Sequence, residues 1–303
     1  ISLSQKGIAV KAIVDNREEI DSKLIYEVEK NNIKIFKGST VVDTYGYKRI
    51  NKVSIMQLSK DGQNIIGSKI DLSCDCLGIS GGWTPAVHLF TQSGGKLKFR
   101  DEDQVFIPNV YPSDQISVGA CNGDLTLDSI LVNVPKSLKD FLNIKNSVYE
   151  NFDVLSSHNN FKRNIWLLPS DKVLGKTKSF VDYQNDATAK DIKLALREGF
   201  KSIEHVKRYT TTGMGTDQGK LGNMHALGII SETSEAKMGE LGTTTFRPPY
   251  TPLTFGTIVG RNVGEYFDAY RKTPIHEWHV KNNAKFENVG QWKRAWYYPK
   301  NKE

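Results

Sequence analysis

The sequence has few cysteines and no long apolar stretch, and both shortages narrow the class of protein. Three of its 303 residues are cysteine, Cys74, Cys76 and Cys121, and an odd, sparse set of this kind does not make a disulfide framework. No apolar run approaches the ~20 residues that a membrane helix needs, and the first residues lack the order of a signal peptide. We therefore expect a soluble, cytoplasmic chain without a membrane partner. Because it begins at Ile1 and not at Met, we also expect the natural N-terminus to lie upstream.

The positive charge is not concentrated in one stretch. The chain carries 41 Lys and Arg against 34 Asp and Glu, a formal net charge of +7, but these residues are scattered, with short groupings such as Lys207-Arg208. Neither a recognition helix nor an aromatic RNA-binding signature accompanies them, which argues against a nucleic-acid partner. The same charge would suit a protein that handles anionic cofactors or meets acidic subunits. The length is sufficient for at least two domains with cores of their own.

The first 36 residues have the pattern of half a dinucleotide-binding unit. An apolar run over residues 7–15 ends in Asp15 and predicts a buried parallel strand; a helix and a second strand at residues 33–36 follow. In such a unit a carboxylate at the end of a strand binds the adenosine ribose, and Asp15 stands at that place. The glycine-rich turn would have to precede Ile1. The alternative, that Asp15 merely ends a strand, has equal weight.

Residues 39–72 alternate in polarity and predict an antiparallel meander. Residues 74–80 then predict a buried strand that ends at Gly81-Gly82, and residues 115–121 predict a strand that leads through a glycine turn into a helix. This order resembles the second half of the two-dinucleotide-domain reductases over about the first 135 residues. The resemblance implies that the following residues line a dinucleotide: Gly119, Ala120, Asn122, Gly123 and Leu125.

A helical pair is predicted after an irregular linker at residues 136–178, whose apolar group at 165–169 should pack on its neighbours. Thr188 followed by Asp191 has the spacing of a capping box and predicts a helix start. Gly199 then supplies a stop, and Ser202 can cap a second short helix that ends near Tyr209.

The stretch that follows this pair, residues 210–220, is called here the threonine loop. It holds four threonines and three glycines, and Lys220 ends it. Its glycines do not have the spacing of a P-loop. Backbone amides, hydroxyls and the cations of Lys207 and Arg208 could nevertheless converge on a phosphate. A hydroxyl-rich loop that only caps helices is the alternative.

Residues 180–223 resemble a sequence block of the alpha subunits of heterotetrameric sarcosine oxidases. The same block is similar to a ferredoxin-type [2Fe–2S] domain related to the bacterioferritin-associated one, whose cysteines would fall near Asp182, Gln184, Asp217 and Gly222. None of these positions is Cys, and a cluster needs thiolates, so we expect no iron–sulfur cluster. In lacking the cluster cysteines, the sequence resembles the sarcosine oxidases and not the related amino-acid and opine dehydrogenases, which generally carry the cluster.

Three further blocks, at residues 76–90, 241–252 and 271–299, resemble the same family. The resemblance implies an α/β plus α+β chain in which a partial FAD/NAD reductase-like fold with two dinucleotide-binding domains precedes a helical ferredoxin-like module without a cluster. The implied domains are the C-terminal part of the reductase-like domain at 1–135, the linker at 136–178, the helical domain at 179–262, and the start of an aminomethyltransferase-like, folate-binding domain at 263–303.

The family resemblance implies oxidative demethylation of sarcosine to glycine with oxygen and tetrahydrofolate. FAD on a beta subunit would oxidise the amine, and FMN shared between the alpha and beta subunits would pass electrons to oxygen. The alpha subunit, with beta, gamma and delta partners, would contribute an NAD site, part of the FMN site and the folate domain, but no catalytic residue, so that the isolated chain is inactive. The residues implied near the FMN phosphate are Lys207, Arg208, Thr210, Thr211, Thr212, Lys220 and Arg247.

Two other functions and one metal site are alternatives that the sequence leaves to consider. Intact cluster cysteines would favour a dehydrogenase subunit for proline, an opine or an N-methyl amino acid, and their absence counts against it. A non-catalytic assembly module is the other alternative, because the sequence lacks the glycine-rich turn and most of the folate domain. His276 and His279 are three residues apart, whereas the helical zinc motif needs a spacing of four. The sequence therefore predicts no metal site.

Overall fold

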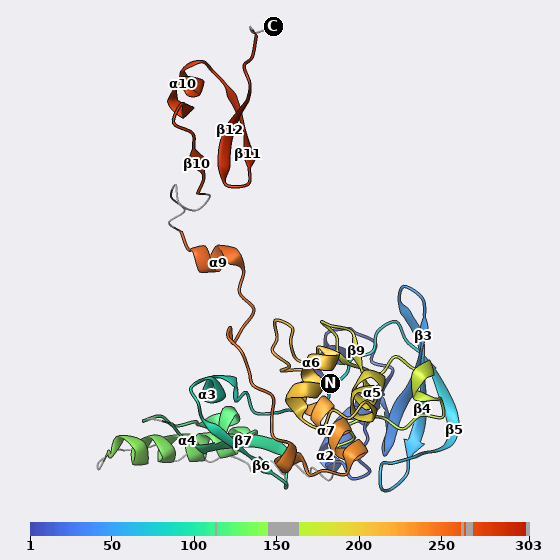
Figure 1. Ribbon diagram of the computed structural model, residues 1–303. Coiled ribbons are helices and arrows are strands. Elements are labelled where there is room, and N and C mark those ends of the chain that lie inside the picture. Colours follow the sequence, from blue (N-terminus) through green and yellow to red (C-terminus); the bar gives the residue numbers. More distant parts are fainter. Residues whose placement is uncertain (113, 145–163, 262–263, 265–268, 301–303) are drawn as a thin grey trace. The chain divides into compact units, whose positions relative to one another are not determined.

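The computed structural model describes residues 1–112, 114–144, 164–261, 264 and 269–300. The chain divides into two compact units, residues 1–251 and residues 252–303, each built from both helices and strands (Figure 1). This is the mixed α/β composition that the sequence predicts. Over the described ranges, no helix combines the length and the apolar character needed to cross a bilayer.

The N-terminal elements form a parallel strand–helix–strand unit. In chain order they are α1 (Ser2–Gln5), β1 (Ala12–Val14), α2 (Ser22–Lys30) and β2 (Lys34–Phe36). Ile13 lies opposite Ile35 in the parallel pair. Asp21 caps α2 by accepting a hydrogen bond of 2.8 Å from the backbone N–H of Lys23. Val28 is buried, whereas Leu24 on the same face is 55% exposed. The predicted order of strand, helix and strand is thus confirmed, although the first strand is shorter than the predicted run and only partly buried.

The predicted meander is also confirmed. Its strands are β3 (Ser39–Gly46), β4 (Ile50–Leu58) and β5 (Ile65–Ser73), paired antiparallel in that order. The central strand buries Val53 and Ile55, because alternate residues of a strand point to the same face. Leu58, beyond an irregularity in the pairing after Ile55, is also buried.

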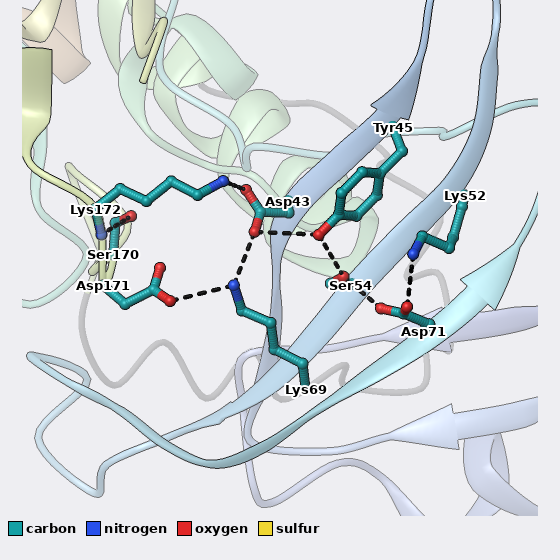
Figure 2. A network of polar contacts seen from close by, with 9 residues as sticks. All are labelled: Asp43, Tyr45, Lys52, Ser54, Lys69, Asp71, Ser170, Asp171 and Lys172. Carbon is teal, nitrogen blue, oxygen red and sulfur yellow. Dashed lines mark hydrogen bonds and ion pairs between the residues drawn. The ribbon is translucent and has the colours of Figure 1, made fainter. Parts of the chain in front are cut away.

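Polar side chains connect this meander to Asp171 and Lys172 of the linker (Figure 2). Asp43 pairs with Lys69 at 2.9 Å and with Lys172, and Lys69 also pairs with Asp171 at 3.2 Å. The linker is therefore attached to the sheet by alternating charges, just before it enters the helical part of the unit.

Two predicted strands are wrong. Residues 74–87 form neither a helix nor a strand, and Gly81 and Gly82 are exposed. Residues 115–118 pair with no described strand, and residues 119–122 form a 3-10 turn. The physical reason for the second error is local: Gly119 and Gly123 have φ of +68° and +88°, left-handed values that interrupt an extended strand.

A hairpin that the pattern did not reveal takes the place of those strands in the core. It consists of β6 (Lys96–Arg100) and β7 (Val105–Val110), and it follows α3 (His88–Gln92) and precedes α4 (Leu127–Leu142). Val105, Phe106 and Ile107 are buried, and Phe106 joins the main core of the helical module.

The helical module contains the predicted pair of helices and completes the first unit. Its elements are β8 (Phe180–Asp182), β9 (Ala187–Thr188), α5 (Ala189–Arg197), α6 (Ile203–Thr210), α7 (Asn223–Ser234) and α8 (Met238–Leu241). Thr188 and Asp191 form the predicted capping box. Ser202 precedes α6 as predicted, but its side chain makes no capping bond.

The core of this module is formed mainly by α5, α6 and α7. Ile192, Val206 and Ile230 are among its fully buried members, and Trp166 and Leu167 of the linker pack against it. A Cβ on Gly228 of α7 would lie 2.0 Å from the indole of Trp166. The prediction that the apolar group of the linker packs on its neighbours is therefore confirmed.

The second unit is a small three-stranded sheet with helices. Its elements are α9 (Phe255–Val259), β10 (Arg271–Lys272), α10 (His276–Lys281), β11 (Lys285–Val289) and β12 (Trp292–Tyr297), with sheet order β10-β12-β11. His276 is buried and its ring lies 4.7 Å from that of Phe286, while His279 contacts the hydroxyl of Tyr298. In the described ranges no group of three or more His, Cys, Asp or Glu side chains could hold a metal ion.

Candidate functional site

The first three threonines of the threonine loop, which begins at the end of α6, use their hydroxyls for hydrogen bonds within the protein. The Thr210 Oγ1 donates a hydrogen bond of 2.7 Å to the carbonyl of Val206 and can accept one from the Thr212 Oγ1, which lies 2.9 Å away, and both threonines are buried. Thr211 has φ of +61° and its hydroxyl donates to the Thr210 carbonyl at 2.6 Å. The three hydroxyls therefore stabilise the end of the helix, as the capping alternative requires.

The carboxylate of Asp182 holds the loop from the neighbouring β8–β9 turn. It accepts hydrogen bonds from the backbone N–H groups of Gln184 at 2.8 Å, Asn185 at 3.0 Å and Gly213 at 2.7 Å. Asp182 is 5% exposed. Three N–H donors compensate for the loss of water around a buried carboxylate.

Gln184 and Asp217 close the rest of the loop. The Gln184 Oε1 accepts from the Asp217 N–H at 3.2 Å, and its Nε2 donates to the Thr216 Oγ1 at 3.1 Å. Asp217 in turn accepts from the Gly219 N–H at 3.1 Å. A Cβ at Gly222 would lie 2.4 Å from the Val181 carbonyl oxygen. All four positions at which the iron–sulfur resemblance would place cysteine thus lie around this loop, three of them as hydrogen-bonding side chains.

Several amides that could have received a phosphate are therefore already satisfied. The N–H groups of Gly213, Asp217 and Gly219 donate to side chains of the protein itself. Acceptors on Asp182, Gln184 and Asp217 do in this loop what a bound anion would do in a phosphate loop.

The segment after α8, residues 242–251, is called here the strap. Two side chains of α6 bind the backbone of one strap residue, Thr245. The Lys207 Nζ donates to the Thr245 carbonyl at 2.9 Å, and the Glu204 carboxylate accepts from the Thr245 N–H at 2.5 Å. Burial lowers the pKa of Lys207, although the charge of Glu204 opposes the shift. Burial would raise the pKa of Glu204, but the Thr245 hydrogen bond and the charge of Lys207 outweigh it, so that this pKa is lowered.

The threonine loop and α7 hold the strap at three further points. Lys220 bonds to the Tyr250 carbonyl, and its Nζ lies 3.8 Å from the centroid of that ring. Asn223 donates to the Thr244 Oγ1 at 3.0 Å, and the Gln218 Oε1 accepts from the Arg247 N–H at 2.9 Å. Lys207 and Lys220, both predicted near a phosphate, are thus engaged with strap carbonyls.

His88 brings a third segment to the same place. Its ring lies 3.9 Å from that of Phe246, and its Nε2 is 3.3 Å from the Gln218 carbonyl oxygen. His88 is 5% exposed, and its Nδ1 has no partner among the described residues. Burial lowers its pKa. The sequence blocks at residues 76–90, 180–223 and 241–252 therefore meet around this imidazole.

The residues predicted to line a dinucleotide lie in one turn before α4. Gly119, Ala120 and Asn122 belong to the 3-10 turn, and the Gly123 carbonyl accepts a hydrogen bond of 2.9 Å from Arg100. Leu125 follows and is partly buried.

Asp15, the predicted ribose ligand, is bound to a neighbouring cation. Its carboxylate accepts from the Nε of Arg17 at 3.0 Å and from the Nη2 at 2.7 Å. Burial would raise the pKa of Asp15, but the hydrogen bonds and charge of Arg17 outweigh it, so that this pKa is lowered.

Pattern reasoning missed Glu204, Gln218, Asn223 and His88 as contacts of the strap. The spacing of Glu204 and Lys207, one helical turn apart, is the local signal that places both on one face of α6. The strap partners of the other three lie 21 to 158 positions away, and no local pattern reports such contacts.

Comparison with known proteins relates the chain to one group of oxidases. Residues 176–261 match the family model described as the Sarcosine oxidase A3 domain. The chain is 35% identical over 306 aligned residues to the sarcosine oxidase subunit alpha of Corynebacterium sp. (strain P-1), and 31% identical over 313 to that of Rhizobium meliloti (strain 1021). These alignments cover 97% and 99% of this chain but 31% and 29% of the relatives, so the chain spans about a third of their length.

Among solved structures, the chain is similar to an L-proline dehydrogenase from P. horikoshii, with a TM-score of 0.49 and 17% identity, over 83% of this chain and 50% of that one. The resemblance to sarcosine oxidase alpha subunits that the sequence blocks indicated is confirmed along nearly the whole chain by the curated relatives.

Proposed function

We propose that this chain, a relative of sarcosine oxidase alpha subunits over nearly its whole length, serves as part of such a subunit in a flavin-dependent complex that oxidises an N-methyl amine. The observation that carries the proposal is the coverage of the alignment: 97% of the chain matches a sarcosine oxidase subunit alpha at 35% identity. The A3 domain match at residues 176–261 supports the same assignment.

The proposed reaction is the oxidative demethylation of sarcosine to glycine. Bound flavins, FAD on a beta-type subunit and FMN between that subunit and this one, would supply the redox chemistry, with oxygen as the electron acceptor and tetrahydrofolate as the one-carbon acceptor. The role proposed for this chain is to bind cofactors and partners of the beta, gamma and delta types. None of its residues is assigned to catalysis, so the chain alone would be inactive.

The fit to the cofactors differs between the two proposed sites. At the NAD site, Gly119 and Gly123 have left-handed φ, which suits a tight turn near a pyrophosphate, while the Gly123 carbonyl and N–H are bonded to Arg100 and to the Ala120 carbonyl. At the FMN site the amides of the threonine loop are occupied by Asp182, Gln184 and Asp217. The cations of α6 and the strap are better suited to bind a phosphate than these occupied amides. The residues proposed for that phosphate are those of the family resemblance: Lys207, Arg208, Thr210, Thr211, Thr212, Lys220 and Arg247.

The domain boundaries belong to the same proposal. A reductase-like part at residues 1–135, a linker at 136–178, the helical domain at 179–262 and the start of a folate-binding domain at 263–303 would each correspond to a part of the longer relatives. A dehydrogenase of the proline or opine type is less favoured, because sarcosine oxidase subunits match nearly the whole chain.

The test is co-expression of the full-length subunit with candidate beta, gamma and delta subunits. The purified complex should contain both FAD and FMN and should release peroxide when sarcosine is added in air. A complex that oxidises sarcosine only with an artificial electron acceptor, and forms no peroxide, would favour a dehydrogenase. A complex without flavin or activity would favour the non-catalytic assembly module and contradict the proposal.

A further inference from the structure

Two of the three cysteines lie one residue apart where the meander ends. Cys74 and Cys76 are free thiols, the first partly buried and the second exposed. The Cys74 N–H donates to the Asn51 carbonyl at 3.2 Å, next to the pair of Lys52 and Ser73 that ends the ladder of β4 and β5. Cys74 is thus anchored to the sheet, whereas Cys76 lies in the exposed segment that leads to α3.

The backbone between the two thiols permits them to meet. A disulfide needs Cα atoms about 4.4–6.8 Å apart, and two residues of extended chain span about 7 Å at most. Residues i and i+2 of an extended chain also point to the same side. The chain bends at Asp75, which brings the flanking residues closer together than an extended strand would. Across the described ranges, Asp75 and Cys76 make no backbone hydrogen bond that closure would have to break.

The third thiol has a different setting. The Cys121 Sγ donates to the Val118 carbonyl at 3.1 Å, at the start of the turn before α4, and no other cysteine is near it in the sequence. Cys74 and Cys76 are therefore the pair that the covalent chain itself holds together. A solvent-accessible thiol beside a second, resolving thiol is the arrangement found in redox-sensitive proteins.

We propose that Cys74 and Cys76 are a peroxide-sensitive dithiol that closes reversibly to a disulfide. The thiolate of Cys76, the exposed residue, attacks one oxygen of hydrogen peroxide; the O–O bond breaks, hydroxide leaves, and a sulfenic acid remains on Cys76. The Cys74 thiol then attacks that sulfur, the S–S bond forms, and the sulfenic oxygen leaves as water. Two electrons pass from the dithiol to the peroxide, and both thiol protons end in the two water molecules that form.

The dithiol is independent of the proposed function, although that reaction also releases peroxide. Closure would restrain the start of the exposed segment that carries Ile79 and Trp83, whose side chains are both largely exposed.

The test follows the thiols of the purified chain by mass spectrometry. After treatment with hydrogen peroxide, free thiols are blocked with iodoacetamide. Trypsin then releases residues 70–96, which hold both cysteines of the dithiol, apart from residues 101–136, which hold Cys121. The first peptide should lose two hydrogen atoms and both alkylation sites, and dithiothreitol should restore both thiols. The second peptide should remain alkylated.

Two serine variants separate the dithiol from ordinary thiol oxidation. Cys121→Ser should behave as wild type. In Cys76→Ser no disulfide can close within residues 70–96, so prolonged peroxide treatment should carry Cys74 to the sulfinic acid, which dithiothreitol does not reduce. The thiol recovered at Cys74 should then be several-fold lower than in wild type.

Three results for wild type would overturn the dithiol: residues 70–96 that stay fully alkylated, that end as sulfinic acid, or that become joined to residues 101–136 or to a second chain. Neither flavin content nor sarcosine oxidation enters these measurements, so the dithiol and the proposed function stand or fall separately.

Discussion

The imidazole of His88 stacks on the ring of Phe246, with centroids 3.9 Å apart and an angle of 32° between the planes. The two residues belong to different sequence blocks, and the Gln218 carbonyl from a third block meets the His88 Nε2. An Nε2–H that donates to this carbonyl leaves Nδ1 as a buried acceptor without a described partner. Protonation would place a second N–H in that apolar surrounding, close enough to Lys220 to feel its charge.

The first prediction concerns the pH dependence of this junction. Because burial lowers the pKa of His88 from its usual 6.5, the unfolded chain takes up a proton at higher pH than the folded chain. The contribution of His88 to the free energy of unfolding is therefore fully present above about pH 6.5 and decreases as the pH falls below that value. Urea unfolding between about pH 8 and about pH 5 should show a smaller loss for His88→Phe than for wild type.

The matched control is His205→Phe, at an exposed histidine of α6. His225, whose pKa burial also lowers, stays present in both variants and contributes equally. A His88→Phe profile parallel to that of wild type would contradict the assignment of the acid loss to His88.

The second prediction concerns the buried carboxylate that holds the threonine loop. In Asp182→Asn an amide would replace an acceptor of three N–H bonds, and its NH₂ group would face a donor. We expect a loss of about 2–4 kcal/mol in the free energy of unfolding, the range for breaking a buried charged network. Asp186→Asn, at an exposed position of the same turn with φ of +53°, should be nearly neutral because Asn tolerates that conformation. Denaturant midpoints of the two variants give the comparison; equal values would show that Asp182 does not hold the loop.

Local signals in the sequence account for the parts of the fold that pattern reasoning found. The capping box of Thr188 and Asp191 spans three residues and predicted the start of α5 correctly. The strand at residues 115–121 failed because the left-handed φ of Gly119 is not visible in an apolar pattern. The predicted phosphate loop carried suitable residue types, but the acceptor for Gly213 lies 31 positions earlier, on Asp182. Whether a glycine amide meets a ligand or its own protein is thus decided by contacts distant in sequence.

The third prediction tests the close packing of α7 on the linker. A Cβ at Gly228 would lie 2.0 Å from the ring of Trp166, so Gly228→Ala should force the indole out of the core and cost about 1–3 kcal/mol. At Gly239 of α8 the nearest contact to an added Cβ is 3.4 Å, so Gly239→Ala should be neutral or slightly stabilising. The fluorescence of Trp166 should shift to longer wavelength in the first variant alone. An unchanged spectrum and midpoint in Gly228→Ala would contradict the packing.

The last prediction concerns the ion-pair network in Figure 2. Asp43 is 11% exposed and carries two lysine partners, Lys69 at 2.9 Å and Lys172. The hydrogen bond of Lys172 is the main cause that lowers the pKa of Asp43. Stability from this carboxylate is therefore present above its ordinary pKa of about 4 and is lost as the pH falls through the lowered value.

Salt should distinguish this contribution from packing, because the lysine side chains are partly exposed and salt screens such pairs. Asp43→Asn should lower the free energy of unfolding by about 0.5–1 kcal/mol at low ionic strength, and the difference from wild type should nearly vanish at about 1 M NaCl. Asp75→Asn, an exposed carboxylate for which no ion pair is found in the described ranges, should show no such salt dependence. Urea midpoints at the two salt concentrations provide the measurement. A loss in Asp43→Asn that persists at high salt would mean that the carboxylate stabilises β3 through its local hydrogen bonds. The linker would then be attached to the meander by packing and not by charge, for example near Gly62, where an added Cβ would lie 3.4 Å from the Ile165 Cδ1.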